Sequence, residues 1–116
     1  MKYQETPEFS PEAKVDLDSQ DPKVVCNALL AICLNSGDYD TSINSVRKTI
    51  TSYNDQIKSL AITCSGHIAR IWRKIEQDLV TVVEEVWLDK NDPLWGYADD
   101  ALDDFEVFIK DYRKPK

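Results

Sequence analysis

The feature that most constrains the fold of this chain is a set of helix-start signals that recurs along the sequence. Asp21-Pro22 and Asp92-Pro93 repeat one pair of residues, and Asn54-Asp55 lies between them. Asp or Asn before a helix accepts hydrogen bonds from its first free amides, and proline at the first helical position loses no needed hydrogen bond. The helices opened by these signals are about 33 and about 39 residues apart, which is the period of an α-solenoid built from helix pairs.

Apolar residues recur at helical spacing behind each start, and two further helices fit between the marked ones. The five predicted helices begin near residues 22, 39, 55, 77 and 94. Their apolar stripes consist of Val25, Ala28, Leu29 and Ile32; Ile43, Val46, Ile50 and Tyr53; Ile57, Leu60, Ala61, Cys64, Ile68 and Ile71; Leu79, Val82, Val83 and Val86; and Ala98, Ala101, Leu102, Phe105, Phe108 and Ile109. Periodicity near 3.6 residues predicts amphipathic helices. We therefore predict an all-α fold of about five helices stacked as helical hairpins. A simple helix bundle would show the same stripes, but the repeat period and matched caps favour stacking.

Composition changes divide the chain into three parts. Residues 1–20 are polar, contain Pro7 and Pro11, and predict an irregular N-terminal arm, with Phe9 or Leu17 packed on the body. Residues 21–112 predict a single helical domain, and residues 113–116 a polar tail. Gly66 lies inside a predicted helix, where glycine costs stability, so we expect a neighbouring helix to approach it closely.

The charge balance restricts the possible partners. The chain has 21 acidic and 14 basic residues, for a net charge of −7. Binding of nucleic acid needs a positive surface, and an anionic membrane would repel this chain. A basic protein partner fits the sign, since opposite charges steer association, although acidity also serves solubility alone. No segment predicts a secretory signal or a membrane span, and three cysteines in apolar surroundings predict reduced thiols in the cytoplasm.

No residue pattern predicts catalysis. Cys64 and His67 would lie three residues apart on one helix, as a nucleophile with a base or as two metal ligands. No neighbouring carboxylate in the sequence orients the imidazole, and no CxxC pair completes a zinc site. The three glycines are isolated, so no phosphate-binding loop can form. We therefore expect no enzymatic activity, no cofactor and no metal, with Cys64 part of the core.

Acidic residues gather at the start of the last predicted helix. Residues 89–104 carry six acidic side chains and one lysine, so most of the net charge lies there and in the arm. The helix dipole explains Asp99 and Asp100, but its effect fades by Asp103 and Asp104. Three interpretations remain open: a docking surface for arginine and lysine of a partner, a cation site, or a solvated face.

The candidate partner-binding residues combine this acidic group with an aromatic side chain. Tryptophan serves as a large core anchor or as a contact that carries much of an interface's binding energy. Trp95 lies at the entrance of the last helix beside the acidic residues, whereas Trp87 fits the core. The preceding helix ends nearby, so its acidic side chains would add to the same field. The predicted set is Asp99, Asp100, Asp103, Asp104, Trp95, Glu84 and Glu85.

Two stretches resemble HEAT-type repeats. Residues 54–71 open with Asn54-Asp55, place Ala61 at a tight helix contact and carry Gly66 in place of a bulkier side chain; residues 92–105 resemble the opening of the next repeat. Over roughly residues 21–110, the chain is similar to small bacterial HEAT-like proteins, among them immunity proteins of contact-dependent growth inhibition and related toxin systems.

The resemblance implies a non-catalytic protein, and we expect it to be cytoplasmic and monomeric when free. Such a protein would bind and neutralise a cognate bacterial toxin domain, and a basic nuclease would fit the acidic surface. The alternative is a HEAT-like adaptor or assembly subunit with no toxin partner, because such repeats are general scaffolds for protein binding.

Overall fold

Six helices and no strand make up residues 9–115, the part of the chain that the computed structural model describes. The helices are α1 (Glu12–Asp16), α2 (Pro22–Asn35), α3 (Tyr39–Thr49), α4 (Asp55–Trp72), α5 (Gln77–Trp87) and α6 (Trp95–Phe108). This confirms the predicted all-α class, with one helix more than the five expected. Within the described residues, no helix is both long enough and apolar enough to cross a membrane.

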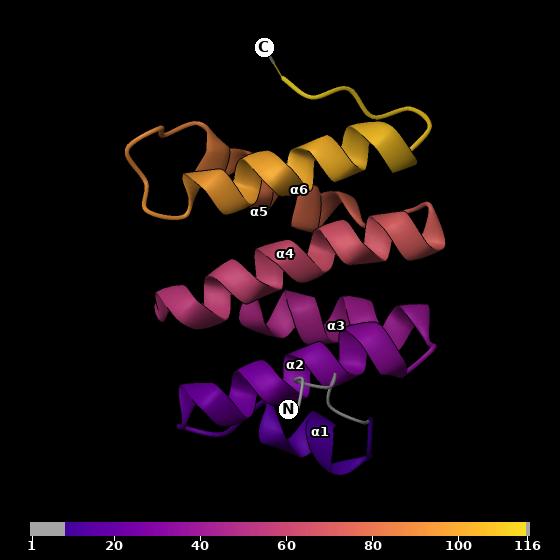
Figure 1. The fold of residues 1–116 in the computed structure, drawn as a ribbon, viewed down its shortest axis with the longest axis vertical. Helices are drawn as coiled ribbons and strands as arrows, with labels where there is room; N and C mark the ends of the chain where they lie inside the picture. Colours follow the sequence, from indigo (N-terminus) through magenta and orange to yellow (C-terminus); the bar gives the residue numbers. More distant parts are fainter. Residues whose placement is uncertain (1–8, 116) are drawn as a thin grey trace, which may run out of the picture.

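The helices are stacked along the longest axis of the molecule, from α1 at one end to α6 at the other (Figure 1). Helices α2, α4 and α6 pack side by side, with α4 in the middle. Helix α3 packs on α2 and α4, and α5 packs on α6. Consecutive helices therefore pack together from α1 to α4, whereas α5 packs on α6 rather than on α4.

Two of the three repeated helix starts are caps, and the third is a turn. The Asp21 carboxylate accepts a hydrogen bond from the Lys23 amide at 3.0 Å, and the Asn54 side chain accepts one from the Ile57 amide at 3.0 Å. Asp92 instead accepts from the Leu94 amide at 2.8 Å, and α6 begins only at Trp95. Leu94 is buried, so the turn at Asp92 places this side chain in the core before the helix begins.

Most residues of the predicted stripes are buried, and Ile62, Ala69 and Val80 outside the stripes are buried as well. Leu29, Val46, Ile68 and Leu102 are among the fully buried side chains, and together they join α2, α3, α4 and α6. Tyr53 and Ile71 were predicted to be buried, and both are exposed. Tyr53 lies beyond the end of α3. Ile71 lies in the last turn of α4, where Trp72 takes the inward position and packs on Tyr39.

The N-terminal arm is more ordered than predicted. Its residues 1–8 lie outside the described part of the chain, but Glu12–Asp16 form α1, which packs on α2. Ala13 is buried against Ala28 and Ile32, and Phe9 and Leu17 pack on this small cluster. The expected contact of Phe9 or Leu17 with the body is confirmed, and this contact explains why a short helix forms in a polar segment.

Gly66 on α4 faces Asp104 of α6 at short range. A Cβ atom added to Gly66 would lie 2.6 Å from Oδ2 of Asp104 on α6, so the expected close approach of a neighbouring helix is confirmed. The nearest atoms belong to the carboxylate, which can rotate away from a methyl group. A larger side chain at this position would have to separate the two helices.

We expect Gly66→Leu to destabilise the protein by about 1–3 kcal/mol, the usual cost of overpacking. Gly66→Ala should stay within about 1 kcal/mol of the parent, because the higher helix propensity of alanine offsets the displaced carboxylate. Urea unfolding measures both. Gly96 in α6 is the control, since nothing lies within 4 Å of a Cβ added there. Equal losses from Gly66→Leu and Gly96→Leu would contradict the close approach.

Candidate partner-binding surface

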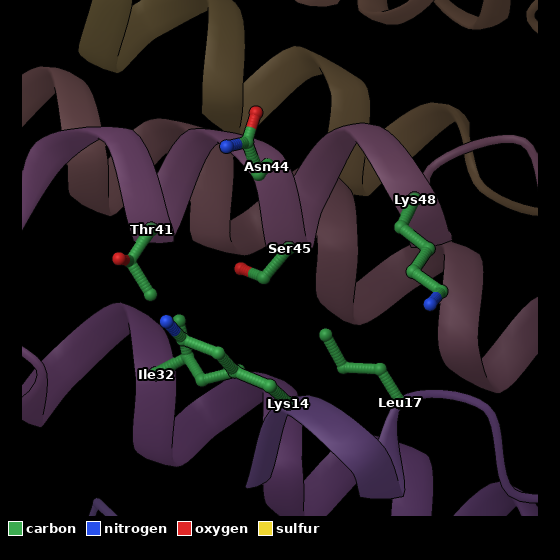
Figure 2. A pocket seen from close by; sticks show the side chains of 7 residues that line it. All are labelled: Lys14, Leu17, Ile32, Thr41, Asn44, Ser45 and Lys48. Carbon is green, nitrogen blue, oxygen red and sulfur yellow. The ribbon is translucent and has the colours of Figure 1, made fainter. Parts of the chain in front are cut away.

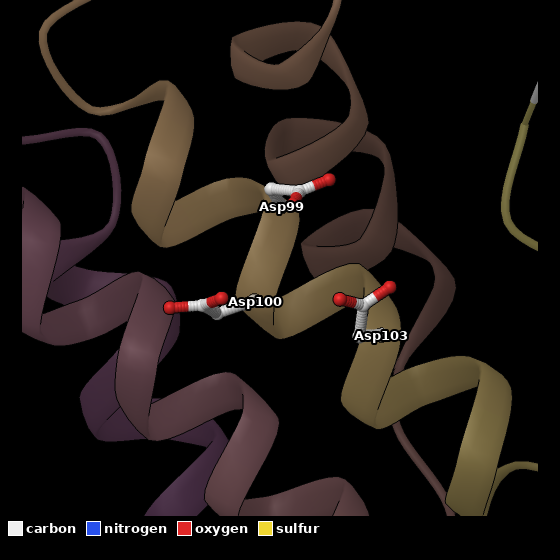
Figure 3. A group of neighbouring side chains, drawn as sticks. All are labelled: Asp99, Asp100 and Asp103. Atoms are coloured by element: carbon white, nitrogen blue, oxygen red, sulfur yellow. The ribbon is translucent and has the colours of Figure 1, made fainter.

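The acidic block, defined as Asp99, Asp100, Asp103 and Asp104, lies on α6 at one end of the helix stack. Figure 3 shows the first three of these carboxylates on adjacent turns of the helix. One oxygen from each of Asp99, Asp100 and Asp103 can be chosen so that all lie within 4.8 Å of one another. Three carboxylates this close together could share a cation. In the structure, a lysine ammonium group lies against two of them.

That ammonium group belongs to Lys114. Its Nζ lies 2.5 Å from Oδ1 of Asp99 and 2.8 Å from Oδ1 of Asp103, and its side chain is 19% exposed. Hydrogen bonds from Lys114 and then Trp87 lower the pKa of the Asp99 carboxyl, and hydrogen bonds to Asp103 and Asp99 raise the pKa of Lys114. Lys114, predicted to lie in a polar tail, is therefore held against α6.

Two tryptophans position this ion pair. The indole N–H of Trp87 donates to Asp99 at 3.0 Å, and the indole N–H of Trp95 donates to the backbone oxygen of Trp87 at 2.8 Å. The two rings are stacked, with centroids 6.4 Å apart. Both side chains are half-buried and line a groove of about 550 Å³ together with Leu88, Lys90, Asp99 and Pro115. The structure thus places Trp95 beside the acidic block.

Asp104 faces α4 rather than the C-terminal segment. Its carboxylate lies over Gly66, and Nη2 of Arg70 is 3.8 Å from its Oδ2. Burial raises the pKa of the Asp104 carboxyl, although the positive charge of Arg70 acts in the opposite direction. The acidic block therefore has two sets of internal partners: Lys114 contacts Asp99 and Asp103, and Arg70 contacts Asp104.

The two glutamates of α5 differ in their surroundings. Glu84 is half-buried, and its Oε2 accepts a hydrogen bond from the Tyr112 hydroxyl at 2.8 Å. Tyr112 also packs edge-on against Phe105, with ring centroids 5.8 Å apart. Glu85 is exposed. Tyr112 and Lys114 are members of this surface that the sequence analysis did not name, and their only signal was a basic and aromatic run directly after the acidic helix. Trp87 was expected in the core and is half-buried at this surface.

Cys64 and His67, the candidate catalytic pair, have different environments. Cys64 is fully buried. A hydrogen bond with Cys33 and burial raise the pKa of its thiol well above the usual value. This disfavours the thiolate, which is the reactive form. His67 is half-buried beside Arg70 and Asp104, and burial followed by the charge of Arg70 lowers its pKa. Cys64 therefore belongs to the core, as expected.

The lowered pKa of His67 makes part of the stability pH-dependent. The imidazole of His67 binds a proton less tightly in the folded state than in the unfolded state. Its contribution to the free energy of unfolding is therefore present above the ordinary pKa of 6.5 and is lost as the pH falls through the lowered pKa. We expect the parent to lose more stability than His67→Gln between about pH 8 and about pH 5. Urea unfolding at both pH values measures this difference, and identical pH profiles would contradict it.

A second cavity lies at the other end of the stack, between α1, α2 and α3. It has a volume of about 210 Å³ and is lined by Lys14, Leu17, Ile32, Thr41, Asn44, Ser45 and Lys48 (Figure 2). Lys48 is paired with Asp18 at 2.5 Å. Lys14 of this cavity lies on α1 and the acidic block lies on α6, and these two helices are at opposite ends of the stack (Figure 1).

Comparisons with known proteins find similarity to solved structures but not to protein-family models or curated sequences. No protein-family model matches the sequence, and no curated protein matches it. A chain in the crystal structure of a CDI complex from Cupriavidus taiwanensis LMG 19424 has a TM-score of 0.72 and 26% sequence identity to this chain. The match covers 95% of this chain and 99% of that chain. The similarity to a component of a CDI complex agrees with the resemblance inferred from the sequence.

Proposed function

We propose that this protein is the immunity component of a contact-dependent growth inhibition (CDI) system and that it binds and neutralises the toxin domain encoded with it. The observation that carries the proposal is the match to a chain of a CDI complex over nearly the whole length of both chains. That relationship favours a partner in the same kind of complex over an adaptor with no toxin.

The properties of the surface favour the role of inhibitor within such a complex. Stacked helical hairpins present extended faces suited to binding another protein. The chain has a net charge of −7, and Cys64, half of the candidate catalytic pair, is buried with its thiolate disfavoured. These features support a protein that acts by occupying a partner rather than by chemistry of its own.

The proposed partner is a basic toxin domain, for which a nuclease is the best example. A nuclease cleft is positively charged because it binds phosphates, and an acidic protein can take their place and associate rapidly. We assign the contact to the acidic block with Trp95, Glu84 and Glu85. This end of the molecule combines concentrated negative charge with a half-buried aromatic side chain, a combination that gives interfaces fast association and strong local contacts.

The proposal also defines where the protein acts and in what form. A toxin delivered into a neighbouring cell has to be met inside that cell, so we place the protein in the cytoplasm, as a monomer until it meets the toxin. Its negative charge keeps it from nucleic acid and from anionic membrane surfaces.

Co-expression tests this function. The toxin domain encoded directly upstream of this gene should stop growth when expressed alone, and expression of this protein should restore growth. The two purified proteins should also form a stable complex. Cys64→Ala is the matched control, because an inhibitor that acts by binding keeps its rescue when this thiol is removed and the fold is retained. Failure to rescue growth or to form a complex would favour the adaptor.

A further inference from the structure

The segment after α6 turns back across the acidic block. The Lys114 amide donates to Oε1 of Glu106 at 3.1 Å, and Tyr112 reaches Glu84 on α5. Lys114 then contacts two carboxylates of the block, and Pro115 lines the groove formed with the two tryptophans. A basic side chain followed by proline therefore covers the surface to which we assign the toxin.

We propose that Lys114 and Pro115 occupy the place of a lysine or arginine of the partner and of the apolar residue beside it, and that binding displaces them. This inference rests on the proposed function, because it names the chemical group that the same surface receives. The C-terminal segment is then an internal competitor of the partner.

The contacts of Lys114 define what the site recognises. Its ammonium group lies against Oδ1 of Asp99, Oδ1 of Asp103 and, at 5.8 Å from the centroid, the ring of Trp87. Trp87 also donates its indole N–H to Asp99, which fixes one of the two carboxylates. Two carboxylates and an aromatic face suit an ammonium or guanidinium group. The adjoining groove, which Pro115 lines together with Leu88 and Trp95, suits an apolar neighbour.

The same contacts allow the segment to leave. Residues 113–115 form no regular secondary structure, and the Asp103 carboxylate that binds Lys114 is 57% exposed. The ion pair with Asp103 is therefore open to solvent on one side and contributes little net stability, whereas the pair with Asp99 is more enclosed, with side chains 19% and 28% exposed. An incoming basic side chain would replace one ion pair with an equivalent one, and the groove of about 550 Å³ gives its neighbour a place to bind.

The test compares two lysine substitutions in the full chain. Lys114→Ala opens the site, and Lys110→Ala, in the same segment and exposed, removes the same charge elsewhere. The probe is a short fluorescent peptide of alternating lysine and proline, titrated at low ionic strength and followed by anisotropy. We expect Lys114→Ala to bind it at least about threefold more tightly than Lys110→Ala does, a factor that a weak surface pair can supply.

Two further measurements locate the effect. Adding Asp103→Asn to Lys114→Ala should remove the gain in affinity, and a peptide with glutamine in place of lysine should show no gain. Circular dichroism checks that each variant is folded. Equal affinities of Lys114→Ala and Lys110→Ala would overturn the inference, because only net charge would then matter.

The peptide experiment needs no toxin, so its result is independent of the proposed function. Rescue of growth combined with equal peptide affinities would leave the immunity function standing and overturn the displaced segment. A gain specific to Lys114→Ala without any rescue would support the basic-side-chain site and contradict the toxin as its partner.

Discussion

Replacing Phe105 with alanine is expected to destabilise the protein by about 3–5 kcal/mol, the usual cost of removing a buried aromatic ring. Phe105 is fully buried in α6. It belongs to the core cluster shared with α4 and α5, and its ring packs against Tyr112 in the C-terminal segment. Removing the ring leaves a cavity that several elements would have to fill. The loss is a large part of the 5–15 kcal/mol typical of a whole domain.

Urea unfolding measures this loss, and Val107→Ala is the matched control. Val107 lies two residues further along α6 with 71% of its side chain exposed, so its truncation should change the free energy of unfolding by no more than about 0.5 kcal/mol. Similar losses from both variants would mean that α6 is not anchored through Phe105, and the position of the acidic block would then lack its structural support.

The fold was predictable where local chemistry decides it. Asp21 and Asn54 accept hydrogen bonds from amides two and three residues ahead, so their caps can be read directly from the sequence. Asp92 has the same sequence signal, but its carboxylate accepts from the amide of the buried Leu94, which precedes α6. Tyr53 and Ile71 continue the apolar period of their helices, but no neighbouring helix packs against them. Periodicity indicates which face of a helix is apolar, but it does not show how far along the helix a neighbour packs on that face.

The candidate surface was predictable in location but not in its internal contacts. The acidic block could be placed at the start of the last helix from charge alone. Its ion pair with Lys114 joins residues 15 apart, and the hydrogen bond from Trp87 to Asp99 joins residues 12 apart. Both depend on chain reversals before and after α6. No local pattern specifies these reversals. The sequence therefore did not indicate that a lysine partly neutralises the negative charge of the acidic block.

Charge reversal at Asp100 and Asp103 is expected to slow association with the toxin domain at least about tenfold at low ionic strength, because steering depends on charge close to the contact. Both side chains are exposed, so Asp100→Lys with Asp103→Lys should leave the fold intact. Asp104 is unsuitable for this test, since its half-buried carboxylate lies over Gly66 and beside Arg70. A lysine there would disturb the packing of α4 and α6 as well as the surface.

The matched variant is Asp16→Lys with Asp18→Lys, at the α1 end of the stack. Both pairs of substitutions change the net charge from −7 to −3, and all four aspartates are exposed. Asp18 is paired with Lys48, but both side chains are open to solvent, so losing this pair costs little. The second variant should therefore keep the association rate within about twofold of the parent.

Stopped-flow association at several salt concentrations separates a local field from the overall charge. Steering by a concentrated surface is screened over about 10 Å at 0.1 M salt. The difference in association rate between the two variants should therefore become smaller as salt is added. The dissociation rates show which contacts hold the complex together. If both variants slowed association equally, the rate would follow net charge alone, and the assignment of the contact to the acidic block would have to be withdrawn. A slower association rate for the Asp100→Lys, Asp103→Lys variant alone would instead place the encounter at the α6 end of the stack, where Lys114 already shows how a basic side chain is held.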